Sequence, residues 1–293
     1  MRACSEPSAG WGRAIGVMPA VRPAFLLCLA LAIALPGCRR KSAHSITLAG
    51  STSVQPFAEL LAEEYMKHHR DLEVNVQGGG SSAGIKAVSS CICNIGMSSR
   101  ALTEKEQNLT QTVLAHDAIV LIANARNPVA GMNLDQARLV FSGRIRNWQE
   151  LGGPDLDITV VTREDGSGTR ASFEEAVMTP RPGPDGRKFE PVPFARDALV
   201  QDSNGAVREI VAGDEAAIGY ISFGLVDERV RALVLNGVQP SVKTIRSGKY
   251  PVVRNFLLLT LGAADSCSAQ FLKYALSRPA QGLLAGEGLI PVE

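Results

Sequence analysis

Apolar and polar positions along the chain follow two periods, one typical of strands and the other of helices. Short apolar runs predict strands at 45–49, 72–77, 94–97, 118–123, 158–162, 217–222 and 255–260. Between these runs, apolar residues at helical spacing predict helices at 56–69, 83–89, 134–141, 171–178, 203–211 and 268–277, followed by one further short helix. Strands that alternate with helices in this way indicate an α/β fold whose sheets are covered by helices.

The last strand and helix predict a chain that returns to its first half. A lone terminal strand–helix unit usually packs onto an existing sheet, so we expect 248–293 to join 46–122 in lobe I. Residues 123–247 then form lobe II. The chain is expected to cross between the lobes near 123–127 and again near 243–250.

The N-terminus has the pattern of an export signal. Residues 24–35 form an apolar run that is preceded by arginines, too short to span a bilayer and of the right length for a signal-peptide core. The run ends in Leu35-Pro36-Gly37-Cys38, which resembles the lipobox of bacterial lipoproteins. This predicts a signal peptide at 1–37, a lipid on Cys38 and a polar tether at 38–45, with the protein periplasmic or at the cell surface. Ordinary cleavage nearby, giving a secreted protein without lipid, is the alternative, and Met18 could equally be the start.

Charge and cysteine content exclude several classes of protein. The chain has 30 Lys and Arg against 29 Asp and Glu; removal of the leader takes away three arginines and one glutamate and leaves 27 against 28. A near-neutral protein without a basic block is not built to hold nucleic acid by counterion release. The remaining cysteines, Cys91, Cys93 and Cys267, are too few for a disulfide framework, although one pair could bridge. No histidine lies within twenty positions of Cys91-Ile92-Cys93, so buried thiols fit this motif better than a metal site.

Three glycine- and serine-rich turns carry the candidate chemistry. The turn Asp165-Gly166-Ser167-Gly168-Thr169-Arg170 lies between a predicted strand and a predicted helix, and 78–84 and 50–53 have the same composition. Such a turn directs backbone N–H groups and hydroxyls to one point, and Arg163 adds a fixed positive charge, so together they predict an oxyanion site. The alternative for any one turn is plain helix capping, worth about 1 kcal/mol.

These segments resemble one known family. Gly50-Ser51-Thr52-Ser53-Val54-Gln55-Pro56, residues 78–84, Ile95-Gly96-Met97-Ser98-Ser99-Arg100 and residues 163–169 occur in the order typical of the PstS family, the phosphate-binding proteins of phosphate ABC transporters. The resemblance covers about 46–293. It implies a two-lobed, type II-like periplasmic-binding-protein fold with a ligand cleft between lobes joined by two crossovers. It also implies a monomer without cofactor or catalytic activity that captures inorganic phosphate and delivers it to an inner-membrane ABC permease.

The resemblance also implies which residues bind the ligand. Many members have an aspartate at the position of Ser99 that accepts a proton from hydrogen phosphate and so excludes sulfate. With serine there, Asp117 becomes the best remaining acceptor and Arg100 a possible second cation, unless Arg100 simply pairs with Glu104 or Glu106. Asp165 is expected to orient Arg163. The phosphate-binding residues are therefore predicted to be Thr52, Ser53, Ser81, Ser82, Ser99, Arg100, Asp117, Arg163, Ser167, Gly168 and Thr169.

Other functions fit the residues less well. Residues 78–83 match the dinucleotide fingerprint, but the carboxylate expected about twenty residues later is missing. A serine hydrolase would need the G-x-S-x-G spacing, which Gly166-Ser167-Gly168 lacks, and only His116 could act as its base. A binding protein for sulfate, molybdate or another tetrahedral oxyanion remains open, as does a lipoprotein that presents phosphate to a sensor.

Overall fold

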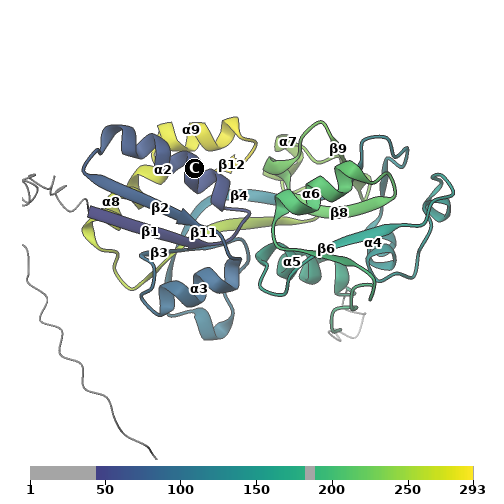
Figure 1. The fold of residues 1–293 in the computed structure, drawn as a ribbon, viewed down its shortest axis with the longest axis horizontal. Helices are drawn as coiled ribbons and strands as arrows, with labels where there is room; N and C mark the ends of the chain where they lie inside the picture. Colours follow the sequence, from purple (N-terminus) through teal and green to yellow (C-terminus); the bar gives the residue numbers. More distant parts are fainter. Residues whose placement is uncertain (1–43, 182–188, 293) are drawn as a thin grey trace, which may run out of the picture. The chain divides into compact units, whose positions relative to one another are not determined.

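The computed structural model describes residues 44–181 and 189–292. The predicted signal peptide, Cys38 and nearly all of the tether lie outside the described residues. The strands and helices of the part described run from β1 to β12 and from α2 to α9 (Figure 1). No helix in this part is both long enough and apolar enough to cross a bilayer.

The first half of the fold is a mixed sheet with helices on both faces. Its strands are β1 (His44–Gly50), β2 (Leu72–Gln77), β3 (Ile95–Ser98), β4 (Leu109–Asn124), β11 (Val253–Leu261) and β12 (Ile290–Pro291). Its helices are α2 (Gln55–His68), α3 (Ser81–Ser89), α8 (Ser266–Ala275) and α9 (Arg278–Gly286). In Figure 1, α2 and α9 lie on one side of these strands and α3 on the other.

Strand β11 shows why helices cover both faces. Its side chains alternate, as in any strand. Phe256 and Leu258 pack into a core with residues of α2, α8 and α9, while Leu257 and Leu259 pack with residues of α3. The C-terminal strand and helices therefore share a core with the first strands of the chain.

The second half is built around a separate core. Its strands in the main sheet are β6 (Thr159–Arg163), β7 (Leu199–Gln201), β8 (Ala217–Ser222) and β9 (Val230–Ala232), and β5 (Gly131–Met132) pairs with β10 (Val234–Leu235). Its helices are α4 (Leu134–Phe141), α5 (Gly168–Phe173), which continues into a π-helical turn at Glu174–Met178, α6 (Asn204–Gly213) and α7 (Val242–Arg246). Trp148, Phe141, Phe173 and Tyr220 are fully buried in this core.

Strand β4 connects the two halves. It pairs with β11 as far as Ala118 and with β8 from Ile119 onward, so both halves belong to one sheet with the order β2-β1-β3-β11-β4-β8-β6-β7. Asp117 lies one residue before the last β4 residue that pairs with β11, Ala118, and is opposite Arg254 of β11.

Most predicted elements are confirmed, and three differences have physical causes. Strand β4 begins at Leu109 instead of 118, because its first residues include the polar, partly exposed run 110–112 and lack a continuous apolar run. The predicted helix at 171–178 begins at Gly168 and becomes π-helical at Glu174. Strand β7, which is short and partly exposed, has no apolar pattern that predicts it.

The three cysteines within the described residues are free. Cys91 is exposed, Cys93 is buried and Cys267 is intermediate. The possible bridge between two of them is therefore not formed, and no group of three metal-ligating side chains occurs in the part of the chain that the structure describes.

Candidate ligand site

The turn after β1 is built by close backbone contacts. Gly50 has φ = +138°, and a Cβ there would lie only 2.9 Å from the Cα of Gly84 and would collide with the carbonyl of Met97. A glycine is therefore required at position 50. The contact draws the ends of β1 and β3 against α3, and the amide of Ser51 donates to the Met97 carbonyl at 2.9 Å.

Three serines from this half meet at the end of the sheet. Ser51 Oγ donates to Ser99 Oγ at 2.8 Å, and the amide of Ser99 donates to Ser81 Oγ at 3.0 Å. The hydroxyls of Ser81 and Ser99 are 3.3 Å apart, and all three residues are buried. Two of the predicted hydroxyl donors, Ser81 and Ser99, are thus neighbours.

The turn after β6 brings the second half against these serines. Ser167 caps α5 by accepting a hydrogen bond from the amide of Arg170 at 3.2 Å. A Cβ on Gly168 would lie 2.6 Å from Ser99 Oγ and would collide with Ser81 Oγ. The amide of Ser82 also donates to the carbonyl of Gly166 at 3.2 Å. The predicted residues of the two halves are therefore in direct contact.

Arg163 supplies a buried cation with a free nitrogen. Its side chain is 1% exposed; Nε and Nη2 donate to Glu164, and Nη2 also donates to Thr52 Oγ1 at 3.1 Å. Nη1 is buried and has no hydrogen-bond partner. A buried N–H without a partner is costly, so this nitrogen points to a ligand that completes it.

The carboxylate beside Arg163 is not the predicted one. Glu164 holds the guanidinium, at 2.9 Å from Nη2, whereas the side chain of Asp165 is 93% exposed and lies 3.0 Å from Arg170. The prediction that Asp165 orients Arg163 is wrong, because the turn directs residue 165 to solvent and residue 164 inward.

A hydroxyl pair joins the two halves beside Arg163. Ser53 Oγ lies 2.7 Å from Thr169 Oγ1, and Asn204 Nδ2 donates to Ser53 Oγ at 2.9 Å. All three residues are buried. In the sequence Asn204 marks only a helix start, and nothing there indicates its contact with the first half.

Asp117 and Arg254 form a buried ion pair next to this hydroxyl pair. Asp117 Oδ2 lies 2.8 Å from Arg254 Nη2 and accepts from Nε at 2.9 Å, while Oδ1 accepts from Ser222 Oγ at 2.8 Å and from the amide of Phe223. Burial raises the pKa of Asp117, and the charge of Arg254 and the Ser222 hydroxyl oppose that rise. Arg254 Nη1 then reaches Thr169 Oγ1 at 2.9 Å. The sequence does not indicate Arg254 as a site residue, because an arginine before an apolar strand resembles a surface charge.

Arg100 pairs with a carboxylate of its own half. Its guanidinium forms a bidentate pair with Glu106, with Nη1 2.8 Å from Oε2. The Arg100 hydrogen bond is the main reason that the pKa of Glu106 falls to about 2. Ser82 is the one predicted site residue whose side chain accepts from Arg100, at 3.4 Å. This is the pairing that the sequence left open as the alternative to ligand binding.

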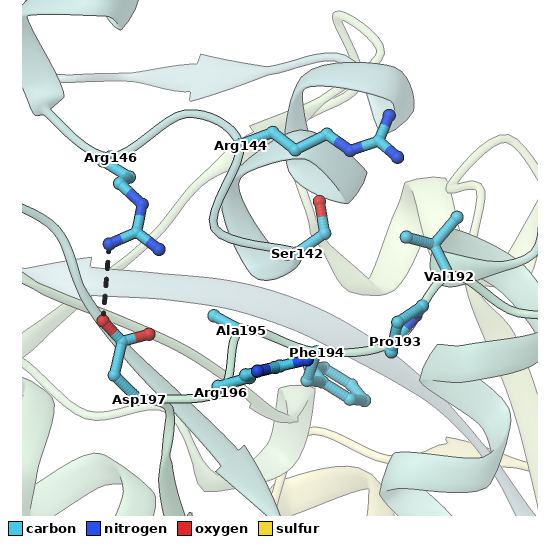
Figure 2. A pocket seen from close by; sticks show the side chains of 9 residues that line it. All are labelled: Ser142, Arg144, Arg146, Val192, Pro193, Phe194, Ala195, Arg196 and Asp197. Carbon is cyan, nitrogen blue, oxygen red and sulfur yellow. Dashed lines mark ion pairs between the residues drawn. The ribbon is translucent and has the colours of Figure 1, made fainter.

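A pocket elsewhere in the second half contains none of the predicted residues. The pocket has a volume of about 440 Å³. Arg146 lies 3.6 Å from Asp197 in its wall, which Figure 2 shows together with the side chains of Arg144 and Arg196. The pocket lies at the C-terminal end of α4, where Ser142, the cap residue of this helix, forms part of its lining. The candidate ligand site is instead the buried cluster around Arg163.

Comparison with known proteins identifies the family. Residues 39–279 match the PBP superfamily domain. The phosphate-binding protein PstS of Bacillus subtilis is 36% identical over 258 residues, which cover 86% of this chain and 82% of that protein. The chain belongs to the PstS family.

Solved structures agree with this PstS-family assignment. A candidate phosphate ABC transporter substrate-binding protein with bound phosphate, from Clostridium perfringens, has a TM-score of 0.79 at 36% identity and covers 85% of this chain and all of its own. An ABC-type phosphate transport receptor from Vibrio cholerae has a TM-score of 0.69 at 36% identity, with 84% of this chain and all of its own covered. The predicted two-lobed periplasmic-binding fold is confirmed.

Proposed function

We propose that this protein captures inorganic phosphate in the cleft between its two lobes and delivers it to an inner-membrane ABC permease. The observation that carries the proposal is the buried, unpartnered Nη1 of Arg163, on a guanidinium whose Nη2 donates to Thr52 Oγ1 of the first half at 3.1 Å. A tetrahedral oxyanion supplies the acceptors that this nitrogen and the hydroxyls need.

The mechanism is closure of two lobes on a desolvated anion. Lobe I, taken as 46–122 plus 248–293, contributes Thr52, Ser53, Ser81 and Ser99. Lobe II, taken as 123–247, contributes Arg163 and the turn 167–169. Charge-assisted hydrogen bonds replace the water around the anion. When the lobes open, water can reach the anion again. No bond is made or broken, so we propose a binding protein without catalytic activity.

The membrane attachment is proposed from the leader alone. We expect cleavage before Cys38, a lipid on this cysteine and a monomer outside the cytoplasm. Mass spectrometry of the mature N-terminus tests this, because a free N-terminus at another residue would exclude the lipid.

Calorimetric titration tests the function. The protein is unfolded and refolded to remove bound ligand, then titrated with phosphate and with sulfate. One-to-one binding of phosphate is the expected result. Binding of sulfate or molybdate alone would keep the fold and change the ligand, and no binding of any tetrahedral anion would overturn the proposal. A phosphate-sensing lipoprotein would bind phosphate equally but would not support uptake in cells that lack their own binding protein.

A further inference from the structure

A closed ring of hydrogen bonds joins six buried residues from both halves. In order around the ring, these residues are Ser53, Asn204, Ser222, Asp117, Arg254 and Thr169. They come from the turn after β1 and from α6, β8, β4, β11 and α5. The ring therefore connects two predicted ligand residues, Ser53 and Thr169, with Asp117, near the point at which β4 changes its partner in the sheet.

Asn204 enters this ring with its side-chain amide held in one orientation. Its Oδ1 accepts from the backbone amide of Ser222 at 3.2 Å, and its Nδ2 donates to Ser53 Oγ at 2.9 Å. A flipped amide would place two donors opposite each other, because a backbone N–H cannot accept. Helix α6 is capped by the neighbouring Ser203, whose hydroxyl accepts from the amide of Ala206. The side chain of Asn204 is therefore not needed to begin the helix.

Both hydroxyls of the Ser53–Thr169 pair accept a hydrogen bond from a group that only donates. Ser53 accepts from Asn204 Nδ2, and Thr169 Oγ1 accepts from Arg254 Nη1 at 2.9 Å. The two oxygens are 2.7 Å apart, so one hydroxyl donates to the other. Two hydroxyls have two protons, and none of the hydrogen bonds among the described residues uses the second one. A buried donor without an acceptor is costly, so this proton indicates a ligand that accepts it.

Two features place this hydroxyl pair near the free nitrogen of Arg163. Thr52, which precedes Ser53, accepts from Arg163 Nη2 at 3.1 Å, and Nη1 of the same guanidinium has no partner. Burial lowers the pKa of Arg254, and the charge of Arg163 adds to this effect, while Asp117 opposes it. The two guanidiniums are therefore close to each other. An oxyanion bound to Arg163 Nη1 can thus also accept the unused proton of the hydroxyl pair.

We propose that Asn204 is a positioning residue of the ligand site: held by Ser222, it donates to Ser53 and so leaves the unused proton of the Ser53–Thr169 pair for the bound oxyanion. An acceptor at position 204 would take that proton instead. The inference rests on the proposed function and adds a residue to its site. Because Asn204 acts through the Ser53 hydroxyl, its contribution to phosphate affinity is lost when that hydroxyl is absent.

A double-mutant cycle of Asn204→Ala and Ser53→Ala, measured by calorimetric titration with inorganic phosphate, tests this role. In the wild-type background, Asn204→Ala is expected to raise the Kd about fivefold, the effect of one lost neutral hydrogen bond. In the Ser53→Ala background, the same change is expected to alter the Kd by less than about twofold. Asn124→Ala is the matched control, because Asn124 is also buried and donates to the carbonyls of Val211 and Ala212 at the other end of α6. It is expected to change the Kd by the same factor in both backgrounds.

Asn204→Asp separates positioning from folding. The carboxylate can still accept from the Ser222 amide and lies in the first turn of α6, where a negative charge is favourable, so the variant is expected to fold. It replaces the donor to Ser53 with an acceptor that captures the hydroxyl proton. Repulsion between the new charge and phosphate is the same with and without Ser53. The loss of phosphate affinity is therefore expected to be about fivefold larger in the wild-type background than in the Ser53→Ala background.

Equal losses of affinity in the two backgrounds, for either substitution of Asn204, would overturn the inference, because Asn204 would then not act through Ser53. An unchanged Kd for Asn204→Ala in the wild-type background would also overturn it. Urea unfolding of each variant without ligand shows whether a loss of affinity follows a loss of stability. Absence of phosphate binding by the wild type would instead refute the proposed function.

Discussion

The hydroxyl oxygens of Ser53 and Thr169 lie 2.7 Å apart, although 116 residues separate them in the chain. Ser53 belongs to the turn after β1 and Thr169 to the first turn of α5, which lie on different halves of the fold. Both residues are buried, so their contact joins the two halves away from solvent. Ligand binding and closure should therefore depend on the same small set of groups.

Removal of the Arg163 side chain should greatly weaken phosphate binding. Arg163→Ala is expected to cost ~2–5 kcal/mol, the range for truncating one member of a buried charge pair, or roughly 30-fold to several thousand-fold in Kd. The Glu164 carboxylate would lose its partner, and its unpaired negative charge would lower the affinity for phosphate further. Calorimetry measures the effect, with Arg138→Ala as a control because Arg138 pairs with Asp135 and contacts no predicted site residue. A loss below about threefold would place Arg163 outside the site.

A methyl group at Gly168 should keep the halves apart. Its Cβ would lie 2.6 Å from Ser99 Oγ and collide with Ser81, whereas a Cβ at Gly166 would meet no atom within 4 Å. Gly168→Ala is therefore expected to weaken phosphate binding about tenfold or more while Gly166→Ala leaves it within about threefold. If both variants bind like the wild type, the contact of Gly168 with Ser81 and Ser99 does not form in the bound protein.

The Arg100–Glu106 pair should stabilise the fold in a defined pH range. Because the pKa of Glu106 in the folded protein is lowered to about 2 from an ordinary value near 4.5, its contribution is complete above about pH 4.5 and is lost as the pH falls toward 2. The pair is partly exposed, so the contribution should stay below about 1 kcal/mol. Urea unfolding at about pH 6 and pH 3 should show that Glu106→Gln lowers stability mainly at the higher pH. An equal loss at both values would point to packing instead of charge.

Arg100 itself should contribute little to ligand affinity. Its guanidinium is already held by Glu106 at 2.8 Å, so Arg100→Ala is expected to change the Kd for phosphate by less than about threefold. The measurement is the same titration as for Arg163→Ala. A loss as large as that of Arg163→Ala would restore Arg100 to the ligand site.

The cysteines of the motif 91–93 should differ sharply in reactivity. Cys91 is exposed, whereas burial raises the pKa of the Cys93 thiol and lowers the share of reactive thiolate. Iodoacetamide should therefore label Cys91 first, as peptide mapping would show. Equal labelling of both residues in the folded protein would mean that Cys93 is accessible.

Elements whose pattern is local could be predicted from sequence. The bounds of β2, α4 and β8 agree with the prediction, since each has an apolar pattern closed by a cap or turn. The first part of β4 and all of β7 could not be predicted from the sequence. These strands are partly exposed, and their positions are fixed by their partners in the sheet.

The residues of the candidate site could likewise be predicted only in part. The turns at 50–53, 78–84 and 165–170 are marked by glycines and hydroxyls, and the structure brings them together. Arg254 lies in no such glycine- and hydroxyl-rich turn, so the sequence around it does not indicate a site. It becomes interior only because the register of β11 places it opposite Asp117. A contact set by strand register cannot be read from one sequence, since a shift by one residue would turn the side chain to the other face.

Because both halves use strand β4, they cannot be recombined freely between related proteins. One strand supplies the hydrogen-bond partner of β11 in the first half and of β8 in the second, with the change between Ala118 and Ile119. One half therefore cannot be replaced, as an independent unit, by the corresponding half of a related protein. A chimaera must take all of β4 from one parent, and that parent then dictates which sequences both flanking strands can accept.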